Sequence, residues 1–197
     1  LMTKIADALT YAHKQGVLHR DVKPSNIIID RSGEPYLTDF GLARITQAGE
    51  SPMSADMMLG TPQYISPEQA QGFTNIDART DVYSLGVILY ELVTGRVPFT
   101  GDTTYAIVHK HIYAAQPDPS QLNADIPPEV EKVLLKALSK EPEQRYDTPN
   151  KLMEAFRNAV NNSGLQALDE DRASVAVTLG KDISERTPGG GKYVNIP

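Results

Sequence analysis

The strongest constraint on the fold is one helix that is apolar on nearly every side. Thr80 and Asp81 form a typical helix start, and hydrophobic side chains then occupy most of the helix circumference: Val82, Leu85, Val87, Ile88, Leu89, Leu92 and Val93. A surface helix keeps one polar face toward water, so this pattern predicts a helix that is buried on almost all sides. Such a helix needs other elements around it, and we expect it to organise the core of a mainly α-helical domain.

The rest of the chain can supply these surrounding elements. Hydrophobic periodicity predicts amphipathic helices over residues 1–13, 104–113, 128–138 and 149–160. Two short apolar runs, residues 27–29 and 35–38, flank a turn that contains Ser and Gly, and they predict a short β-hairpin. Between residues 39 and 79 the chain is rich in turns and poor in periodicity, and a loop of this length is usually functional or disordered.

Composition narrows the function classes. With 19 Lys and Arg against 25 Asp and Glu, the net charge is −6, which argues against a general nucleic-acid binder. The chain has no cysteine, which excludes disulfides, thiolate nucleophiles and zinc knuckles and fits a reducing compartment. No apolar run approaches the roughly 18 residues of a membrane span. We therefore expect a cytoplasmic domain with no nucleic-acid partner and no membrane segment in this sequence.

Two polar segments stand out from the rest of the chain. Residues 19–26 read His-Arg-Asp-Val-Lys-Pro-Ser-Asn, and Asp39, Phe40 and Gly41 begin thirteen positions after Asn26. The predicted hairpin lies between the two segments and would bring them together. Alone, an Asp-Phe-Gly run is most often an ordinary turn, so the combination carries the information.

The residue types of these segments suit phosphoryl transfer. That reaction needs a carboxylate near the attacking hydroxyl, oxygen ligands for magnesium and positive charge beside the transferred group. Asp21 would orient the hydroxyl and accept its proton, and Lys23 can neutralise charge on a γ-phosphate. Asn26 and Asp39 offer the oxygen ligands that a hard cation prefers.

Together with Ser66-Pro67-Glu68, these motifs closely resemble the catalytic loop, the magnesium-binding turn and the end of the activation segment of protein kinases. The resemblance covers residues 1–160 and is strongest to the eukaryotic-like Ser/Thr kinases of bacteria. It implies a kinase C-terminal lobe, mainly α with a short β-hairpin. Residues 161–197 are polar and glycine-rich, and they read as a flexible linker or tail.

The resemblance implies a nucleotide and metal site. Asp21 looks like the catalytic aspartate, and Lys23 like the lysine that contacts the γ-phosphate of ATP in Ser/Thr kinases. Asn26 and Asp39 look like the ligands of Mg²⁺, with Mn²⁺ as an alternative metal. Ile28 corresponds to the residue under the adenine ring. The implied partners are ATP and a protein with a Ser or Thr acceptor.

Other positions would support that site. Thr61 would hydrogen-bond near the catalytic residues and help to select a hydroxyl substrate. The resemblance also implies structural roles. His19 and Phe40 would stack in the spine that links the two lobes, and Glu68 and Arg145 would form a buried ion pair at the end of the activation segment. Asp81 would hold the backbone of the catalytic loop.

Regulation is suggested by the arginine that precedes the catalytic aspartate. In such kinases a phosphate on the activation segment pairs with this arginine, here Arg20, and orders the segment. The candidate acceptors are Thr46, Ser51 and Ser54. Similar bacterial kinases often carry threonines six to eight residues before Thr61, where this chain has Met, Ser and Ala, so Ser54 is the favoured candidate.

The sequence lacks several parts that the kinase family uses to hold ATP. It contains no Gly-x-Gly-x-x-Gly-x-Val loop, no Val-Ala-x-Lys strand and no partner-glutamate helix. It also opens within a predicted helix that has no capping residue before it. We therefore expect a fragment without its N-terminal lobe, inactive alone.

Two alternatives to a protein kinase fit the sequence less well. A non-catalytic, pseudokinase-like scaffold has no need to keep Asp21, Lys23, Asn26 and Asp39 together, and a small-molecule phosphotransferase has no need of the long segment that ends at Ser66-Pro67-Glu68. A histidine metal site is disfavoured because two histidines two positions apart, residues 109 and 111, do not share a helix face. We expect these histidines and His13 to be solvated or half-buried.

Overall fold

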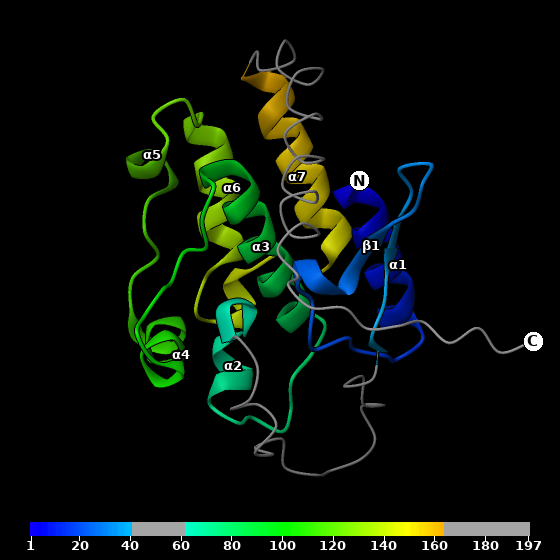
Figure 1. Ribbon diagram of the computed structural model, residues 1–197, viewed down its shortest axis with the longest axis horizontal. Coiled ribbons are helices and arrows are strands. Elements are labelled where there is room, and N and C mark those ends of the chain that lie inside the picture. Colours follow the sequence, from blue (N-terminus) through cyan, green and yellow to red (C-terminus); the bar gives the residue numbers. More distant parts are fainter. Residues whose placement is uncertain (41–61, 164–197) are drawn as a thin grey trace, which may run out of the picture.

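The computed structural model describes residues 1–40 and 62–163, and this part is mainly helical with one two-stranded sheet (Figure 1). Its helices and strands are α1 (Met2–Lys14), β1 (Ile27–Ile29), β2 (Pro35–Leu37), α2 (Pro67–Ala70), α3 (Arg79–Thr94), α4 (Thr104–Tyr113), α5 (Pro119–Leu122), α6 (Pro128–Ala137) and α7 (Pro149–Asn162). The predicted helices and the hairpin are confirmed, with ends that shift by one or two residues. The predicted tail begins within α7, and residues 164–197 lie outside the described part.

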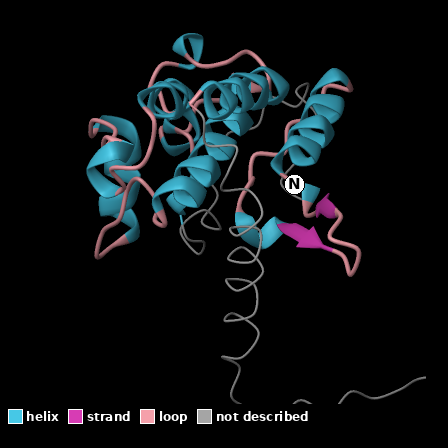
Figure 2. Cartoon of the chain, turned by 90° about the horizontal axis from the view of Figure 1, so that it is seen from above, coloured by secondary structure: helices cyan, strands magenta, loops and turns pink. Residues whose placement is uncertain are grey.

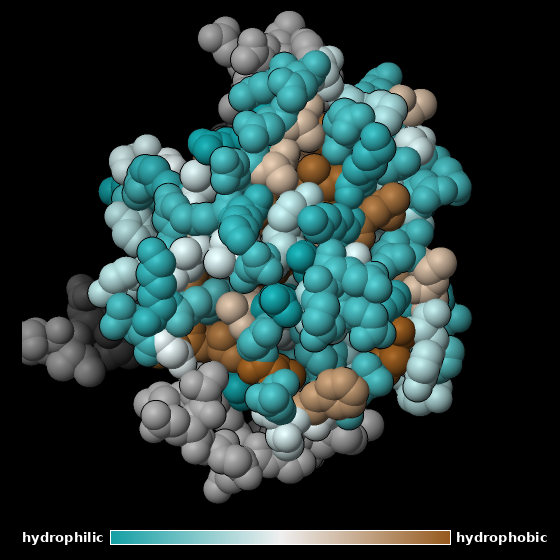
Figure 3. Space-filling view, turned by 180° about the vertical axis from the view of Figure 1, so that it is seen from behind, coloured by the Kyte–Doolittle hydropathy of each residue, from teal (hydrophilic) through white to brown (hydrophobic). Residues whose placement is uncertain are grey.

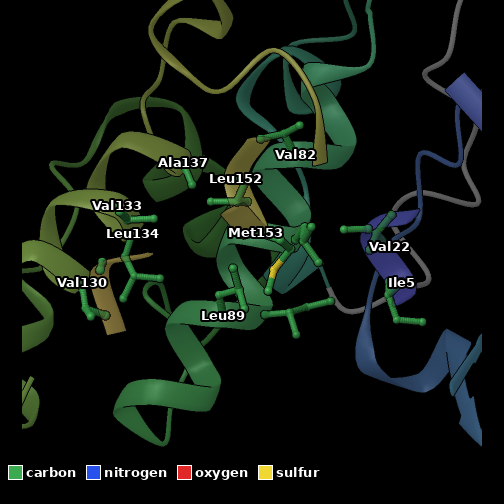
Figure 4. Packing of buried hydrophobic residues seen from close by; sticks show 14 of the residues in the cluster. Ile5, Val22, Val82, Leu89, Val130, Val133, Leu134, Ala137, Leu152 and Met153 are labelled. Carbon is green, nitrogen blue, oxygen red and sulfur yellow. The ribbon is translucent and has the colours of Figure 1, made fainter. Parts of the chain in front are cut away.

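Helix α3 lies at the centre of the domain, as its sequence predicts. Every residue from Thr80 to Tyr90 is buried, and α3 packs against both α6 and α7 (Figure 1). Figure 4 shows side chains of these three helices and of α1 meeting in one cluster: Ile5, Val82, Leu89, Val130, Val133, Leu134, Ala137, Leu152 and Met153. The expectation for Leu92 was wrong, because this residue is 55% exposed, although its neighbour Val93 packs against the core.

Two glycines shape the central helix. A Cβ on Gly86 would lie 2.8 Å from the Cβ of Ala137, so the missing side chain allows α3 and α6 to approach closely. Gly95 ends α3 with a φ of +81°, the left-handed conformation that glycine adopts without steric cost. Both glycines therefore fix where the core helix lies and where it stops.

The hairpin and α1 form the side of the domain that carries the polar loop. Strands β1 and β2 pair antiparallel, with Ile27 opposite Leu37 and Ile28 opposite Tyr36. Ile27 and Leu37 pack against the core, whereas Ile28 is 55% exposed on the other face, beside Tyr36. Figure 2 shows this hairpin at one side of the helical body, near the N terminus.

Two short helices were not predicted. Helices α2 and α5 span four residues each, too few for a hydrophobic period to show. Each begins with a proline at its first position, and α2 also has a capping box formed by Ser66 and Gln69. Local capping chemistry therefore orders part of the stretch that periodicity assigned to a loop.

One face of the domain is largely hydrophilic. Figure 3 shows polar side chains over most of the face seen from behind, with apolar residues in separate patches. Among the residues that the structure describes, no helix is both long and apolar enough to cross a bilayer.

Candidate active site

The polar loop at residues 19–26 is attached to the buried start of α3. Asp81, which is fully buried, accepts hydrogen bonds from the backbone N–H groups of His19 and Arg20 at 2.9 and 2.8 Å. Asp81 lies in the first turn of α3, whose N-cap, Ala78, makes no side-chain bond. The core helix therefore holds the loop through its backbone.

His13 belongs to the same support, which the sequence analysis missed. Its Nε2 donates to Oδ2 of Asp81 at 2.7 Å, and its side chain is only 8% exposed. The expectation of a solvated or half-buried residue is confirmed for His13, which is half-buried as a whole residue. It is wrong for His111, which is fully buried and bonded to the hydroxyl of Tyr83 at 2.9 Å. His109 is exposed, as expected. The sequence pattern of a single helix could not reveal these hydrogen-bond partners, because His13 and His111 each bond to a residue of another helix.

One residue in each of the two polar segments has an unusual backbone conformation. Arg20, which precedes Asp21, has a φ of 65°, and Asp39 has a φ of 60°. Non-glycine residues rarely adopt this left-handed conformation, and such strain persists only where the surroundings hold it and is concentrated at functional sites. Both segments that the sequence singled out therefore carry a locally strained backbone.

Within the loop, three polar side chains converge. Lys23 Nζ lies 2.8 Å from Oδ2 of Asp21, and Asn26 Nδ2 donates to the same oxygen at 3.1 Å and to the backbone carbonyl of Asp21 at 2.8 Å. Asn26 is buried, whereas the Asp21 and Lys23 side chains are 30% and 31% exposed. The carboxylate is therefore oriented by its neighbours but remains open to a reactant.

The hairpin joins this loop to the Asp-Phe-Gly turn. Thr38 donates its backbone N–H to the carbonyl of Asn26 at 2.8 Å, and Nε2 of His19 donates to the carbonyl of Thr38 at 2.9 Å. Asp39 follows directly, and the rings of His19 and Phe40 lie 4.6 Å apart at an angle of 58°. The structure thus brings the loop and the turn together, as the sequence suggested.

A buried ion pair lies farther along the chain. Nη1 and Nη2 of Arg145 donate to the two carboxylate oxygens of Glu68 at 2.7 and 2.8 Å. The guanidinium also donates to the backbone carbonyls of Arg79, Ser139 and Lys140. This bidentate pair joins the start of α2 to the loop between α6 and α7.

Part of the expected site cannot be placed. Gly41, Thr46, Ser51, Ser54 and Thr61 lie outside the described residues, so the expectations for them stay predictions. Within residues 1–40 and 62–163, no group of three or more His, Asp or Glu side chains could hold a metal ion. A cation at this site would therefore depend on the amide oxygen of Asn26 and the carboxylate of Asp39.

The helical lobe, its hairpin and the loop held by α3 define the class of protein. The chain belongs to the protein kinase family, whose protein kinase domain model matches residues 1–156.

Bacterial Ser/Thr kinases are similar to this chain over most of its length. It is 45% identical to the serine/threonine-protein kinase PknB of Mycolicibacterium smegmatis over 149 residues, which are 75% of this chain and 24% of the relative. A probable serine/threonine-protein kinase of Clostridium acetobutylicum is 44% identical over 161 residues, 81% of this chain and 24% of that protein. One from Streptomyces coelicolor is 42% identical over 149 residues, 75% of this chain and 22% of that protein. The chain thus spans about a quarter of the length of these relatives.

Proposed function

We propose that this chain supplies the catalytic lobe of a protein kinase that transfers the γ-phosphoryl group of Mg-ATP to a Ser or Thr hydroxyl of a protein. The observation that carries the proposal is the convergence of Lys23 and Asn26 on one oxygen of Asp21. A positioned carboxylate beside a cation matches what phosphoryl transfer requires, namely orientation of the nucleophile and neutralisation of charge.

Asp21 acts as the base in this proposal. Its partly exposed carboxylate accepts the proton of the attacking hydroxyl, while Asn26 holds the carboxylate in one orientation. Lys23 lies close enough to Asp21 to turn its ammonium group toward a phosphate when the nucleotide is present.

The same loop and turn fit a magnesium ion. Because the amide nitrogen of Asn26 donates to Asp21, the amide oxygen of Asn26 is the atom that would bind the cation. Asp39 would add a carboxylate, since it directly follows Thr38, whose backbone N–H donates to the carbonyl of Asn26. The bound Mg-ATP supplies the phosphoryl group and the metal charge that stabilises the transition state. Ile28, apolar and exposed, suits the adenine ring.

Substrate selection by Thr61 and activation by a phosphate on Ser51 or Ser54 that pairs with Arg20 belong to the proposal as predictions from the family resemblance. The proposal also includes that the 197-residue chain alone is inactive, because no stretch of it matches the glycine-rich loop or the strand lysine that kinases use to hold ATP.

The test joins the ATP-binding lobe of the M. smegmatis relative to residue 1 of this chain; we call the product the joined protein. We expect the joined protein to phosphorylate Ser and Thr in a generic protein substrate, to leave matched Tyr peptides unmodified and to stop when magnesium is chelated. The 197-residue chain alone should give no transfer above background. Failure of the folded joined protein to phosphorylate any substrate would favour the scaffold alternative and contradict the proposal.

A further inference from the structure

We propose that Gln69, on α2, is a positioning residue that holds Asp21 in its reactive place by a hydrogen bond to the backbone of Arg20. Its Nε2 donates to the carbonyl oxygen of Arg20 at 2.7 Å, across 49 positions of the chain. The inference rests on the proposed function, because it assigns Gln69 to the same phosphoryl-transfer site.

The amide group of Gln69 has one orientation. Its Oε1 accepts the backbone N–H of Ser66 at 3.3 Å and lies 3.1 and 3.0 Å from the hydroxyls of Ser66 and Thr80. These hydroxyls are hydrogen-bonded to each other at 2.6 Å, so one of them donates to the other and the second donates to Oε1. Gln69, Ser66 and Thr80 are all buried. Because the oxygen is occupied by these donors, the amide nitrogen is directed toward Arg20.

The bond acts on the peptide group that leads into Asp21. The carbonyl of Arg20 and the N–H of Asp21 belong to one planar peptide, so fixing the carbonyl also fixes the N–H, which donates to Nδ1 of His19 at 3.2 Å. Arg20 has a φ of 65°, and its own N–H is held by Asp81. A strained residue that is held on both sides keeps its geometry, and with it the direction of the next side chain.

The bond also joins two parts of the site that are distant in sequence. Gln69 follows Glu68, whose ion pair with Arg145 fixes α2. Through Gln69, the end of the Ser-Pro-Glu segment therefore has a direct contact with the loop that carries Asp21. Loss of order at that segment would release the peptide before Asp21.

A single substitution separates this role from helix capping. Gln69 is also the third-position partner in the capping box of α2, where its oxygen accepts the N–H of Ser66. Glutamate serves that capping role equally well, but a carboxylate has no N–H for the carbonyl of Arg20. Gln69→Glu thus keeps the capping acceptor and replaces the proposed donor with a buried carboxylate oxygen that faces the carbonyl of Arg20. Gln71→Glu is the matched control, because Gln71, directly after α2, is exposed and its side chain donates to the carbonyl of Pro67.

The first readout is amide hydrogen exchange of the full 197-residue chain, measured by NMR. A hydrogen bond contributes about one kcal/mol, so we expect the Asp21 amide to exchange about 5-fold faster in Gln69→Glu than in the native protein. The amides of α2 should keep their rates, and Gln71→Glu should change neither group. An unchanged Asp21 amide in a folded Gln69→Glu protein would overturn the inference.

The second readout is catalysis by the joined protein. A misplaced base reduces the stabilisation of the transition state and leaves ATP binding unchanged. Gln69→Glu should therefore lower kcat by about 10- to 100-fold with an unchanged KM for ATP. If the native joined protein is active and Gln69→Glu retains full kcat, Gln69 has no positioning role. If the native joined protein is inactive, the proposed function fails, and the Asp21 amide still decides whether Gln69 positions the loop.

A measurement on the native chain decides the case in which Gln69→Glu does not fold. The side-chain NH₂ protons of Gln69 should then exchange at least about 10-fold more slowly than those of Gln71, because the Gln69 amide is buried and donates to Arg20. Equal exchange of the two side chains would contradict the inference.

Discussion

Replacing Glu68 with glutamine should destabilise the whole domain, because Arg145 would keep its charge in a dry site. The Arg145 side chain has no exposure to solvent, and Glu68 supplies the negative charge that compensates it. Backbone carbonyls accept its other N–H groups, but they carry no net charge. Glutamine keeps the length of the side chain and one acceptor oxygen, so Glu68→Gln removes the charge with little change in shape.

The expected loss is about 3 kcal/mol in the free energy of unfolding. Removal of one partner from a buried ion pair costs about 3–5 kcal/mol. We place Glu68→Gln at the lower end because the carbonyl bonds of Arg145 and the remaining amide oxygen persist. A domain of this size is stable by only about 5–15 kcal/mol, so the loss is a large share of the total.

Urea unfolding of the 197-residue chain, followed by circular dichroism, measures this loss. The matched control is Glu129→Gln, which breaks an exposed pair with Lys132 at 3.0 Å and should cost less than about 1 kcal/mol. If Glu68→Gln and Glu129→Gln shift the urea midpoint equally, the buried pair does not stabilise the fold and the reasoning is refuted.

Further predictions concern the core and the support of the loop. Burial, with a smaller contribution from Lys140, lowers the pKa of His111 to about 3, so the unfolded chain binds a proton below about pH 6.5 that the native state excludes. The free energy of unfolding should therefore fall as the pH drops from about 6.5 toward 3, and His111→Gln should flatten this dependence in urea titrations while the exposed His109→Gln leaves it intact. Gly86→Ala should cost about 1–3 kcal/mol, because its new Cβ would lie 2.8 Å from that of Ala137, and Ala137→Gly should restore part of the loss in thermal melts; no restoration would mean that the contact is not the cause. Asp81→Asn should accelerate hydrogen exchange at the His19 and Arg20 amides by at least about 10-fold, and unchanged exchange there would argue against Asp81 as their holder.

The fold followed from the sequence where a pattern is long or local. The buried helix α3 is recognisable because its apolar residues surround the helix, and α6 and α7 because theirs form one face. Helices α2 and α5 were not predicted, because four residues are too few to show a hydrophobic period. The exposure of Leu92 was not predicted, because the hydrophobic pattern does not show where the core ends.

The candidate site divides in the same way. Asp21, Lys23 and Asn26 lie in one short loop, so their spacing alone suggested that they meet. His13, on α1, supports the loop through Asp81, and Gln69 reaches the loop from α2; a single sequence gives no signal for a hydrogen bond between such distant segments. The resemblance implied the role of Asp81, but the roles of these two residues are visible only once the helices are packed.

The most direct test of the central claim is the rate of γ-phosphoryl transfer from Mg-ATP to a Ser-containing protein by the joined protein, with and without the carboxylate of Asp21. If Asp21 is the base, Asp21→Asn should lower kcat by about 10²–10⁴-fold, and Asp7→Asn, an exposed change of the same kind on α1, should leave it unaltered. Equal rates for the native and Asp21→Asn proteins would contradict the claim that this loop performs the chemistry.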